Sequence, residues 1–111
     1  MDDLTEFQKN IVNVLVGEGM YGLAIKKELE DYYDEEVNHG RLYPNLDALE
    51  ENDYVEKYAR DERTNEYRLT EKGRKRMKEE IEWRLEKYVG GSEDRKKEVV
   101  EMVNDSLEVQ G

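Results

Sequence analysis

Residues 38–70 read NHGRLYPNLDALEENDYVEKYARDERTNEYRLT, and this stretch decides the fold. Its first part repeats leucine at helical spacing and predicts an amphipathic helix, with Leu42, Leu46 and Leu49 on one face. Proline is tolerated in the first turn of a helix but clashes deeper inside it. Pro44 therefore implies that the helix starts no earlier than about Gly40, and we expect it to end at Asn52.

The second part of the stretch predicts a β-hairpin. Residues 54–60 and 66–70 are rich in tyrosine, valine and leucine, as short strands are, and residues 61–65 are charged or polar, as a turn is. The strands are short and the tip is charged. A helix followed directly by such a hairpin is typical of a recognition helix and its wing.

The flanking sequence predicts further helices. Thr5 and Gln8 have capping-box spacing ahead of an apolar stripe that ends near Gly17, and a second helix is expected from Gly22 to about Tyr33. Beyond the hairpin, we expect a long helix over residues 70–88, a break at Gly90-Gly91, and a last helix capped by Ser92. The predicted fold class is mostly α with a small β-hairpin (α+β). It is a winged helix-turn-helix domain over residues 1–72 followed by C-terminal dimerisation helices over residues 73–111.

Several motifs resemble one family. Residues 40–50, GRLYPNLDALE, resemble the LYPxLxxLE stretch of the PadR family of winged-helix regulators. Residues 66–73, EYRLTEKG, resemble its YxLTxxG signature, and residues 21–29 are similar to its second helix. The resemblance covers roughly residues 7–88. The sequence departs from the pattern at Asn52-Asp53, where the family commonly has glycine, but asparagine can adopt the left-handed conformation that such a helix end needs.

This resemblance implies a function. Members of the family are homodimers that pair through their C-terminal helices, often with the first helix, and bind near-palindromic operators in double-stranded DNA to regulate transcription. We therefore expect a cytoplasmic transcriptional regulator without a cofactor, similar to members that serve in stress responses of halophilic archaea.

The charge distribution bears on both the source and the partner. The chain of 111 residues has a net charge of -11, with 42% charged residues. Residues 54–78 nevertheless carry nine basic and five acidic side chains, so a basic zone lies inside an acidic protein. An acidic surface favours solubility in general and is also typical of salt-adapted proteins. We hypothesise that cations bridge its carboxylates to DNA, because direct phosphate contacts weaken as salt rises.

Composition also excludes several classes. The chain has no cysteine, so disulfides and thiolate metal sites are excluded. The acidic start Met1-Asp2-Asp3 does not resemble an export signal, and no apolar run is long enough to span a membrane. One histidine among scattered carboxylates shows neither metal-ligand spacing nor a catalytic arrangement, so we expect no metal site and no enzyme.

The candidate base-reading residues lie near the start of the third helix. They are Asn38, His39, Arg41 and Asn45. Arginine can pair with guanine and asparagine with adenine, but Asn38 is equally expected as a helix cap, and simple solvation is the alternative for Arg41 and Asn45. Tyr43 is expected either to donate to a phosphate or to pack inside the motif.

The remaining candidate DNA contacts are basic. On the second helix, Lys26 and Lys27 are expected to meet the DNA backbone. In the wing, Arg60 and Arg63 flank the turn and are expected to reach either a phosphate or the minor groove, and Arg68 lies on the second strand. For the lysines the alternative is a solvated face. A further basic run at residues 72–76 opposes the helix dipole and serves either to contact phosphates or to neutralise nearby carboxylates.

The candidate dimer interface is apolar and lies mainly in the C-terminal helices, whose stripes are too extensive for a monomer of this size to bury. It comprises Phe7, Ile11, Met77, Ile81, Leu85, Tyr88, Val99, Val103 and Leu107. Trp83 is expected to belong to the core of that interface or to stack on a planar effector. The rival function is a winged-helix protein-interaction module without DNA specificity, which the acidic surface slightly favours.

Overall fold

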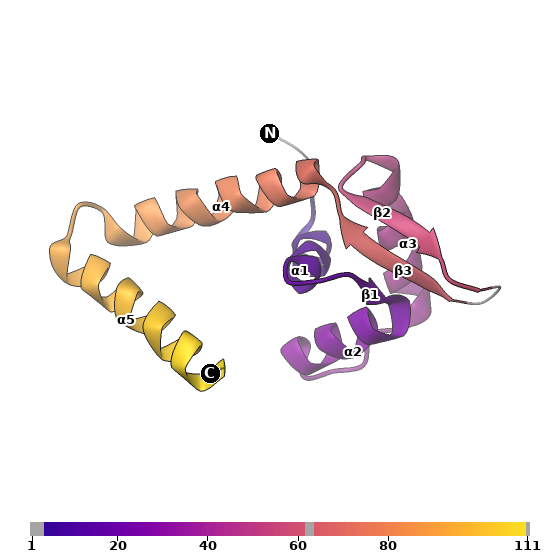
Figure 1. The fold of residues 1–111 in the computed structure, drawn as a ribbon, viewed down its shortest axis with the longest axis horizontal. Helices are drawn as coiled ribbons and strands as arrows, with labels where there is room; N and C mark the ends of the chain where they lie inside the picture. The colour runs from indigo at the N-terminus through magenta and orange to yellow at the C-terminus, as the bar shows by residue number, and fades with distance from the viewer. Residues whose placement is uncertain (1–3, 62–63, 111) are drawn as a thin grey trace. The chain divides into compact units, whose positions relative to one another are not determined.

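The fold was analysed in a computed structural model, which describes residues 4–61 and 64–110, the last four of these by their backbone alone. The chain divides into two compact units, Met1–Met77 and Lys78–Gly111. In order, the described elements are α1 (Glu6–Leu15), β1 (Met20–Tyr21), α2 (Gly22–Tyr33), α3 (His39–Glu51), β2 (Val55–Ala59), β3 (Asn65–Leu69), α4 (Glu71–Val89) and α5 (Glu93–Gln110) (Figure 1). The expected fold class, mostly helical with a small β wing, is confirmed.

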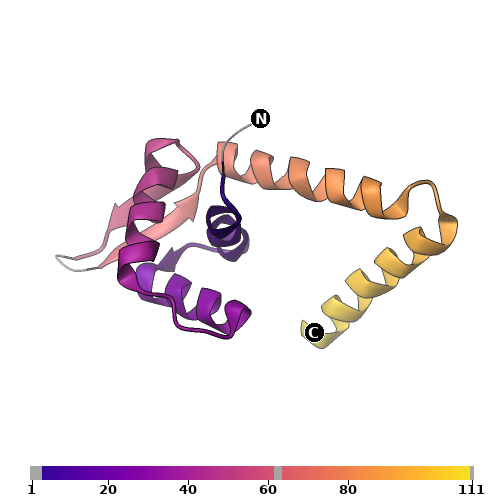
Figure 2. The same cartoon turned by 180° about the vertical axis from the view of Figure 1, so that it is seen from behind.

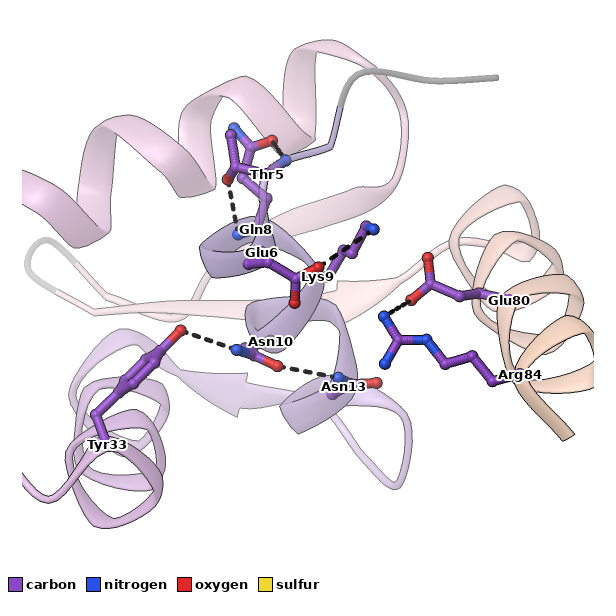
Figure 3. A network of polar contacts seen from close by, with 9 residues as sticks. All are labelled: Thr5, Glu6, Gln8, Lys9, Asn10, Asn13, Tyr33, Glu80 and Arg84. Carbon is purple, nitrogen blue, oxygen red and sulfur yellow. Dashed lines mark hydrogen bonds and ion pairs between the residues drawn. The ribbon is translucent and has the colours of Figure 1, made fainter. Parts of the chain in front are cut away.

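The start of α1 is fixed by the expected capping box. The Thr5 hydroxyl accepts a hydrogen bond from the Gln8 amide, and the Gln8 side chain accepts one from the Thr5 amide, both at 3.1 Å (Figure 3). These two bonds satisfy amide groups that the first helical turn leaves without partners. The sequence therefore determines where α1 begins.

The sheet has one strand more than expected. The strand order is β1-β3-β2, and β1 pairs antiparallel with β3 through Met20 opposite Tyr67 and Tyr21 opposite Glu66. A strand of two residues is too short to show the alternation that reveals a strand in sequence, so only the β2–β3 hairpin was predictable. The wing is therefore a hairpin extended at one edge by β1.

The helix α3 begins at His39, one residue earlier than expected, so Pro44 lies beyond its first turn. Pro44 has no N–H to donate to the Gly40 carbonyl. Gly40 is exposed, so water can hydrate that carbonyl instead. This explains why the helix tolerates a proline at that depth.

Two helix ends turn through the left-handed region at aspartates. Asp34 after α2 has φ 55°, and Asp53 after α3 has φ 64°. We expected the left-handed residue of the second turn to be Asn52, but Asn52 has φ -91°. The neighbouring aspartate supplies that conformation instead.

The core of the first unit joins all of its elements. In Figure 2, α3 lies in front of the sheet, and it packs against β2. The largest fully buried side chains are Ile11, Leu15, Ile25, Leu29, Leu42, Leu46, Leu49, Val12, Val37, Val55 and Tyr67. Three residues expected at a dimer interface belong to this core: Phe7, Ile11 and Met77 are 5%, 0% and 3% exposed. Their own chain already covers most of their surface in the single copy.

The second unit consists of the rest of α4, a turn and α5. Gly90 and Gly91 have φ 50° and 82°, a conformation that favours glycine, and they end α4 as expected. The Ser92 hydroxyl accepts a hydrogen bond from the Arg95 amide at 3.2 Å, which confirms its role as a cap. The Tyr88 hydroxyl donates to Glu98 at 2.8 Å, and this bond ties α5 to α4 and raises the pKa of Tyr88.

Candidate nucleic-acid interface

The Asn38 side chain caps α3. Its oxygen accepts a hydrogen bond from the Arg41 amide at 2.8 Å, so of the two roles expected for Asn38 the structure shows the cap. The next residue, His39, is exposed, and its ring lies 5.5 Å from the ring of Tyr43. Capping fixes where the helix starts and therefore where its polar side chains emerge.

Arg41 and Asn45 lie on the flank of α3 that faces α1. The Arg41 guanidinium stands 4.0 Å above the centroid of the Phe7 ring, although Arg41 remains exposed. Asn45 is half-buried. Its oxygen accepts a hydrogen bond from the Gln8 side chain at 3.0 Å, and its amide donates to the Arg41 carbonyl at 2.7 Å. Asn45 therefore already has partners within its own chain.

Tyr43 lies on the opposite flank, against the start of α2. A Cβ atom placed on Gly22 would come 2.5 Å from the Tyr43 hydroxyl, so only glycine allows this approach. Tyr43 is half-buried and helps to line a pocket of about 110 Å³ together with Tyr21, Asn65 and Tyr67. Burial raises the pKa of Tyr67 in the wall of this pocket. Of the two roles expected for Tyr43, the structure shows packing inside the motif, although its side chain stays partly exposed.

The face of α3 opposite its buried leucines carries residues that we did not single out in the sequence. Gly40, Pro44, Asp47 and Glu51 are all exposed there. The sequence could have indicated this face, because a rotation of about 100° per residue places these positions on the side of the helix away from the leucine stripe. This outer face therefore combines small or apolar groups with carboxylates.

On α2, the two candidate lysines differ. Lys26 donates to Glu30 at 2.8 Å, and the same carboxylate oxygen accepts a hydrogen bond from the Val37 amide at 2.9 Å. The bond from Lys26, followed by the bond from Val37, holds the pKa of Glu30 below its ordinary value. Lys26 thus helps to fix the loop before α3, whereas Lys27 is exposed.

The outer face of the wing carries a cluster of charges that we call the Glu66 cluster, formed by Tyr58, Arg60, Glu66 and Arg68. One Glu66 oxygen accepts from Arg60 at 2.5 Å and from the Arg68 Nε and Nη2 atoms at 2.8 and 2.7 Å. The Arg68 guanidinium also lies 4.7 Å from the centroid of the Tyr58 ring. Arg60, and then Arg68, lower the pKa of Glu66.

We did not recognise Glu66 as a functional candidate from the sequence. The signal lay in strand alternation, because the register pairs Tyr58 with Glu66 and Glu56 with Arg68 on the outer face of the hairpin. The remaining wing candidate, Arg63, lies outside the described residues.

The basic start of α4 has a local structural explanation. Lys72 donates to the Asn52 carbonyl at 2.8 Å, and Arg74 donates to the Val16 carbonyl at 3.0 Å. Both carbonyls lie just beyond the ends of other helices, where acceptors lack helical partners. These two cations therefore serve contacts that were neither of the alternatives considered for them.

Within the described ranges, no group of three or more histidine, cysteine, aspartate or glutamate side chains could hold a metal ion. The same part of the chain contains no helix that is long and apolar enough to cross a membrane.

Comparison with known proteins identifies the family. The Transcriptional regulator PadR-like family matches residues 11–79, which cover most of the winged unit. Among curated proteins, none matches the chain closely. Among solved structures, the "structure of H. salinarum RosR grown from NaBr" is 54% identical in sequence to this chain, with a TM-score of 0.93 and 96% of each chain covered. The structure of an hsRosR-S1 complex is 53% identical, with a TM-score of 0.95, covering 98% of this chain and 96% of that one.

More distant structures agree with this assignment. A PadR family transcription regulator from Clostridium difficile R20291 is 25% identical with a TM-score of 0.64, covering 77% of this chain and 94% of that chain. F93 from STIV, a winged-helix DNA-binding protein, is 25% identical with a TM-score of 0.63, covering 74% and 90%. The relatives in this group are regulators rather than enzymes. The chain therefore belongs to the PadR-like family of transcriptional regulators, and it is a winged-helix protein that regulates transcription by binding double-stranded DNA.

Proposed function

We propose that the chain acts as a homodimer on a near-palindromic operator and regulates genes of a stress response in a halophilic archaeon. The identity of 53% to 54% with RosR over nearly the whole chain supports both the halophilic setting and the regulatory role. A regulator of chromosomal genes in a cell without a nucleus works in the cytoplasm. The domain division that we propose assigns DNA binding to residues 1–72 and dimerisation to residues 73–111.

The exposed apolar side chains beyond residue 78 carry the proposal of a dimer. Ile81, Leu85, Tyr88 and Val103 are 47%, 42%, 47% and 53% exposed in the single chain. Val99 is half-buried and belongs to the same proposed interface, while the side chain of Leu107 lies outside the described part. Burying such a stripe against a second copy removes apolar surface from water, and this stabilises the dimer by about 25 cal/mol for each Å² buried. A two-fold axis is the simplest arrangement in which both copies do so.

Trp83 joins the proposed interface as a candidate. Its side chain is 58% exposed, and the Lys87 ammonium lies 5.7 Å from the centroid of its ring. A large exposed aromatic side chain is typical of an interface anchor.

The proposed DNA contacts come from exposed polar side chains of the winged unit. The direct contacts that we propose come from exposed side chains, namely those of Lys27, His39, Arg41, Arg60 and Arg68. Tyr43 keeps a partly exposed side chain for a phosphate contact. The polar atoms of three other candidates already form hydrogen bonds within the chain, so we propose that these residues hold the contacting side chains in place. They are Lys26, Asn38 and Asn45.

Cations complete the proposed interface. Asp47 and Glu51 stand exposed on the outer face of α3, where phosphates would repel them. Cations prefer oxygen ligands, so an alkali ion held between a carboxylate and a phosphate converts that repulsion into attraction. The net charge of -11 gives a reason for such a mechanism in concentrated salt.

One experiment tests the core of the proposal. Fluorescence anisotropy compares DNA upstream of the chain's own gene with a scrambled duplex, in dilute salt and in about 2 M potassium chloride, where the screening length is only about 2 Å. We expect a preference for the natural duplex that persists at high salt. Loss of affinity with the steep slope of a basic repressor would contradict the cation mechanism, and no preference at either salt would contradict sequence-specific recognition.

A further inference from the structure

The wing arginines are paired with a carboxylate before they meet DNA. Glu66 is half-buried, with 18% of its side chain exposed, while the side chains of Arg60 and Arg68 are 41% and 48% exposed. A single Glu66 oxygen accepts from both guanidinium groups at 2.5 to 2.8 Å. Contacts at this distance between groups that are partly shielded from solvent are screened much less by salt than separated surface charges.

The geometry holds this arrangement in place. Tyr58 lies directly across the hairpin from Glu66, and its ring provides a surface beneath the Arg68 guanidinium. The aliphatic part of Arg68 packs over Gly19, where a Cβ atom would come 2.6 Å from the Arg68 Cγ. Arg60 and Arg68 are thus held on the same side of the sheet by backbone register, a ring and a shared acceptor. Their free orientation is restricted.

We propose that Glu66 is an internal counterion of the wing, which limits the non-specific attraction of Arg60 and Arg68 to phosphates. This inference rests on the proposed contact of Arg60 and Arg68 with DNA. A phosphate oxygen approaching either arginine competes with the oxygen of Glu66, which is already bound. The wing therefore gains less from releasing the counterions of DNA than two free arginines would gain.

The consequence falls on the part of DNA binding that does not depend on sequence. Phosphate contacts act on every DNA sequence, whereas base contacts distinguish sequences. Reducing the phosphate term lowers affinity for all duplexes in dilute salt and leaves the difference between operator and random DNA to the other contacts. It also makes binding by the wing less dependent on salt.

The decisive variant is Glu66→Gln, measured by anisotropy on the upstream duplex and on the scrambled duplex over a potassium chloride series. We expect tighter binding to both duplexes in dilute salt, by about the same factor, so that the ratio between them is kept. The plot of log affinity against log salt should steepen by about 0.9 for one added phosphate contact, which is roughly an eightfold change for each tenfold change in salt.

Glu56→Gln is the matched control. Glu56 lies on the same face of the hairpin, and its replacement by glutamine makes the same change in charge. The Glu56 carboxylate accepts a hydrogen bond from the Tyr58 hydroxyl, and a glutamine side chain can accept that bond as well. We expect this variant to keep the parent's slope. A Glu66→Gln slope equal to that of Glu56→Gln, or weaker binding to both duplexes, would overturn the inference.

Two further measurements separate the possible failures. Arg60→Gln and Arg68→Gln test the proposed contacts directly: if neither changes affinity, the wing contacts are wrong, and the inference about Glu66 falls with them. If they weaken binding while Glu66→Gln matches its control, the inference alone is wrong. Should Glu66→Gln fail to fold by circular dichroism, Glu66→Asp keeps the charge but shortens the side chain. It is expected to steepen the slope in the same direction, and an unchanged slope in this variant overturns the inference.

Discussion

The Gln8 side chain donates a hydrogen bond to the Asn45 side chain at 3.0 Å, which joins the first turn of α1 to the middle of α3. The same Gln8 side chain completes the capping box with Thr5 (Figure 3), so one residue links the start of one helix to the flank of another. The orientation of α3 therefore depends in part on α1.

Replacing Asn45 with alanine tests this link. We expect Asn45→Ala to lower the free energy of unfolding by about 1 kcal/mol, because a partly buried hydrogen bond is lost. Urea denaturation measures the loss. Asn13→Ala is the control, since its bond to Asn10 is exposed, and it should change stability by less than about 0.5 kcal/mol. Equal effects of the two variants would contradict a structural role for the contact.

Asn38 allows its two expected roles to be separated. Asn38→Ala removes the cap of α3 and should cost about 1 kcal/mol of stability, whereas Asn38→Asp keeps a good capping acceptor and should preserve stability. Thermal denaturation gives these values, and anisotropy gives the DNA affinity. If Asn38 only caps, the aspartate variant keeps sequence preference. Loss of preference with intact stability would instead reveal a base contact.

Gly22 should not tolerate a side chain. Because a Cβ atom there would lie 2.5 Å from the Tyr43 hydroxyl, we expect Gly22→Ala to destabilise the fold by about 1–3 kcal/mol. Gly17→Ala is the matched control, since nothing lies within 4 Å of its added Cβ. Combining Gly22→Ala with Tyr43→Phe should restore part of the loss. No restoration would show that the clash involves more than the hydroxyl group.

The loop before α3 should weaken in acid. The pKa of Glu30 is lowered by Lys26 and by the Val37 amide from an ordinary value of 4.5. Its contribution to stability is therefore complete above that value and is lost as the pH falls through the lower pKa of the folded state. Urea denaturation from about pH 3 to 7 should show a shallower acid loss for Glu30→Gln than for the parent. Glu28→Gln, an exposed change on the same helix, should keep the parent's profile.

The second unit should control the oligomeric state. Introducing a charge by Leu85→Asp places a carboxylate in the proposed apolar interface, where burial of an unpaired charge is strongly unfavourable. We expect light scattering to show a monomer at micromolar concentration. Leu23→Glu changes an exposed apolar residue of the first unit and should leave the oligomeric state unchanged. A parent chain that is itself monomeric would contradict the proposed dimer.

Much of the fold could be predicted because local chemistry determines it. The capping box at Thr5, the leucine spacing of α3 and the glycines after α4 each act within a few residues. The strand β1 could not be found in this way, since its two residues are held by pairing with a distant strand.

The candidate site was less predictable for the same reason. The residue types on α3 and the wing indicated DNA contact, but the sequence did not show which atoms were already engaged. Asn45 bonds to a residue 37 positions away, and the bond from Arg74 to Val16 spans 58 positions. Glu66 is closer to its arginines in sequence, and recognising it required the hairpin register.

The two left-handed turns at Asp34 and Asp53 have a consequence for how this chain is adapted. Glycine would adopt φ 55° or 64° with little strain, and a carboxylate next to the C-terminal end of a helix is further disfavoured by the helix dipole. At both positions the chain nevertheless has a hydrated acid in place of the residue that the backbone favours. Both turns therefore keep backbone strain that glycine would relieve, and glycine at either position should raise the melting temperature while removing a hydrated carboxylate from the exposed surface.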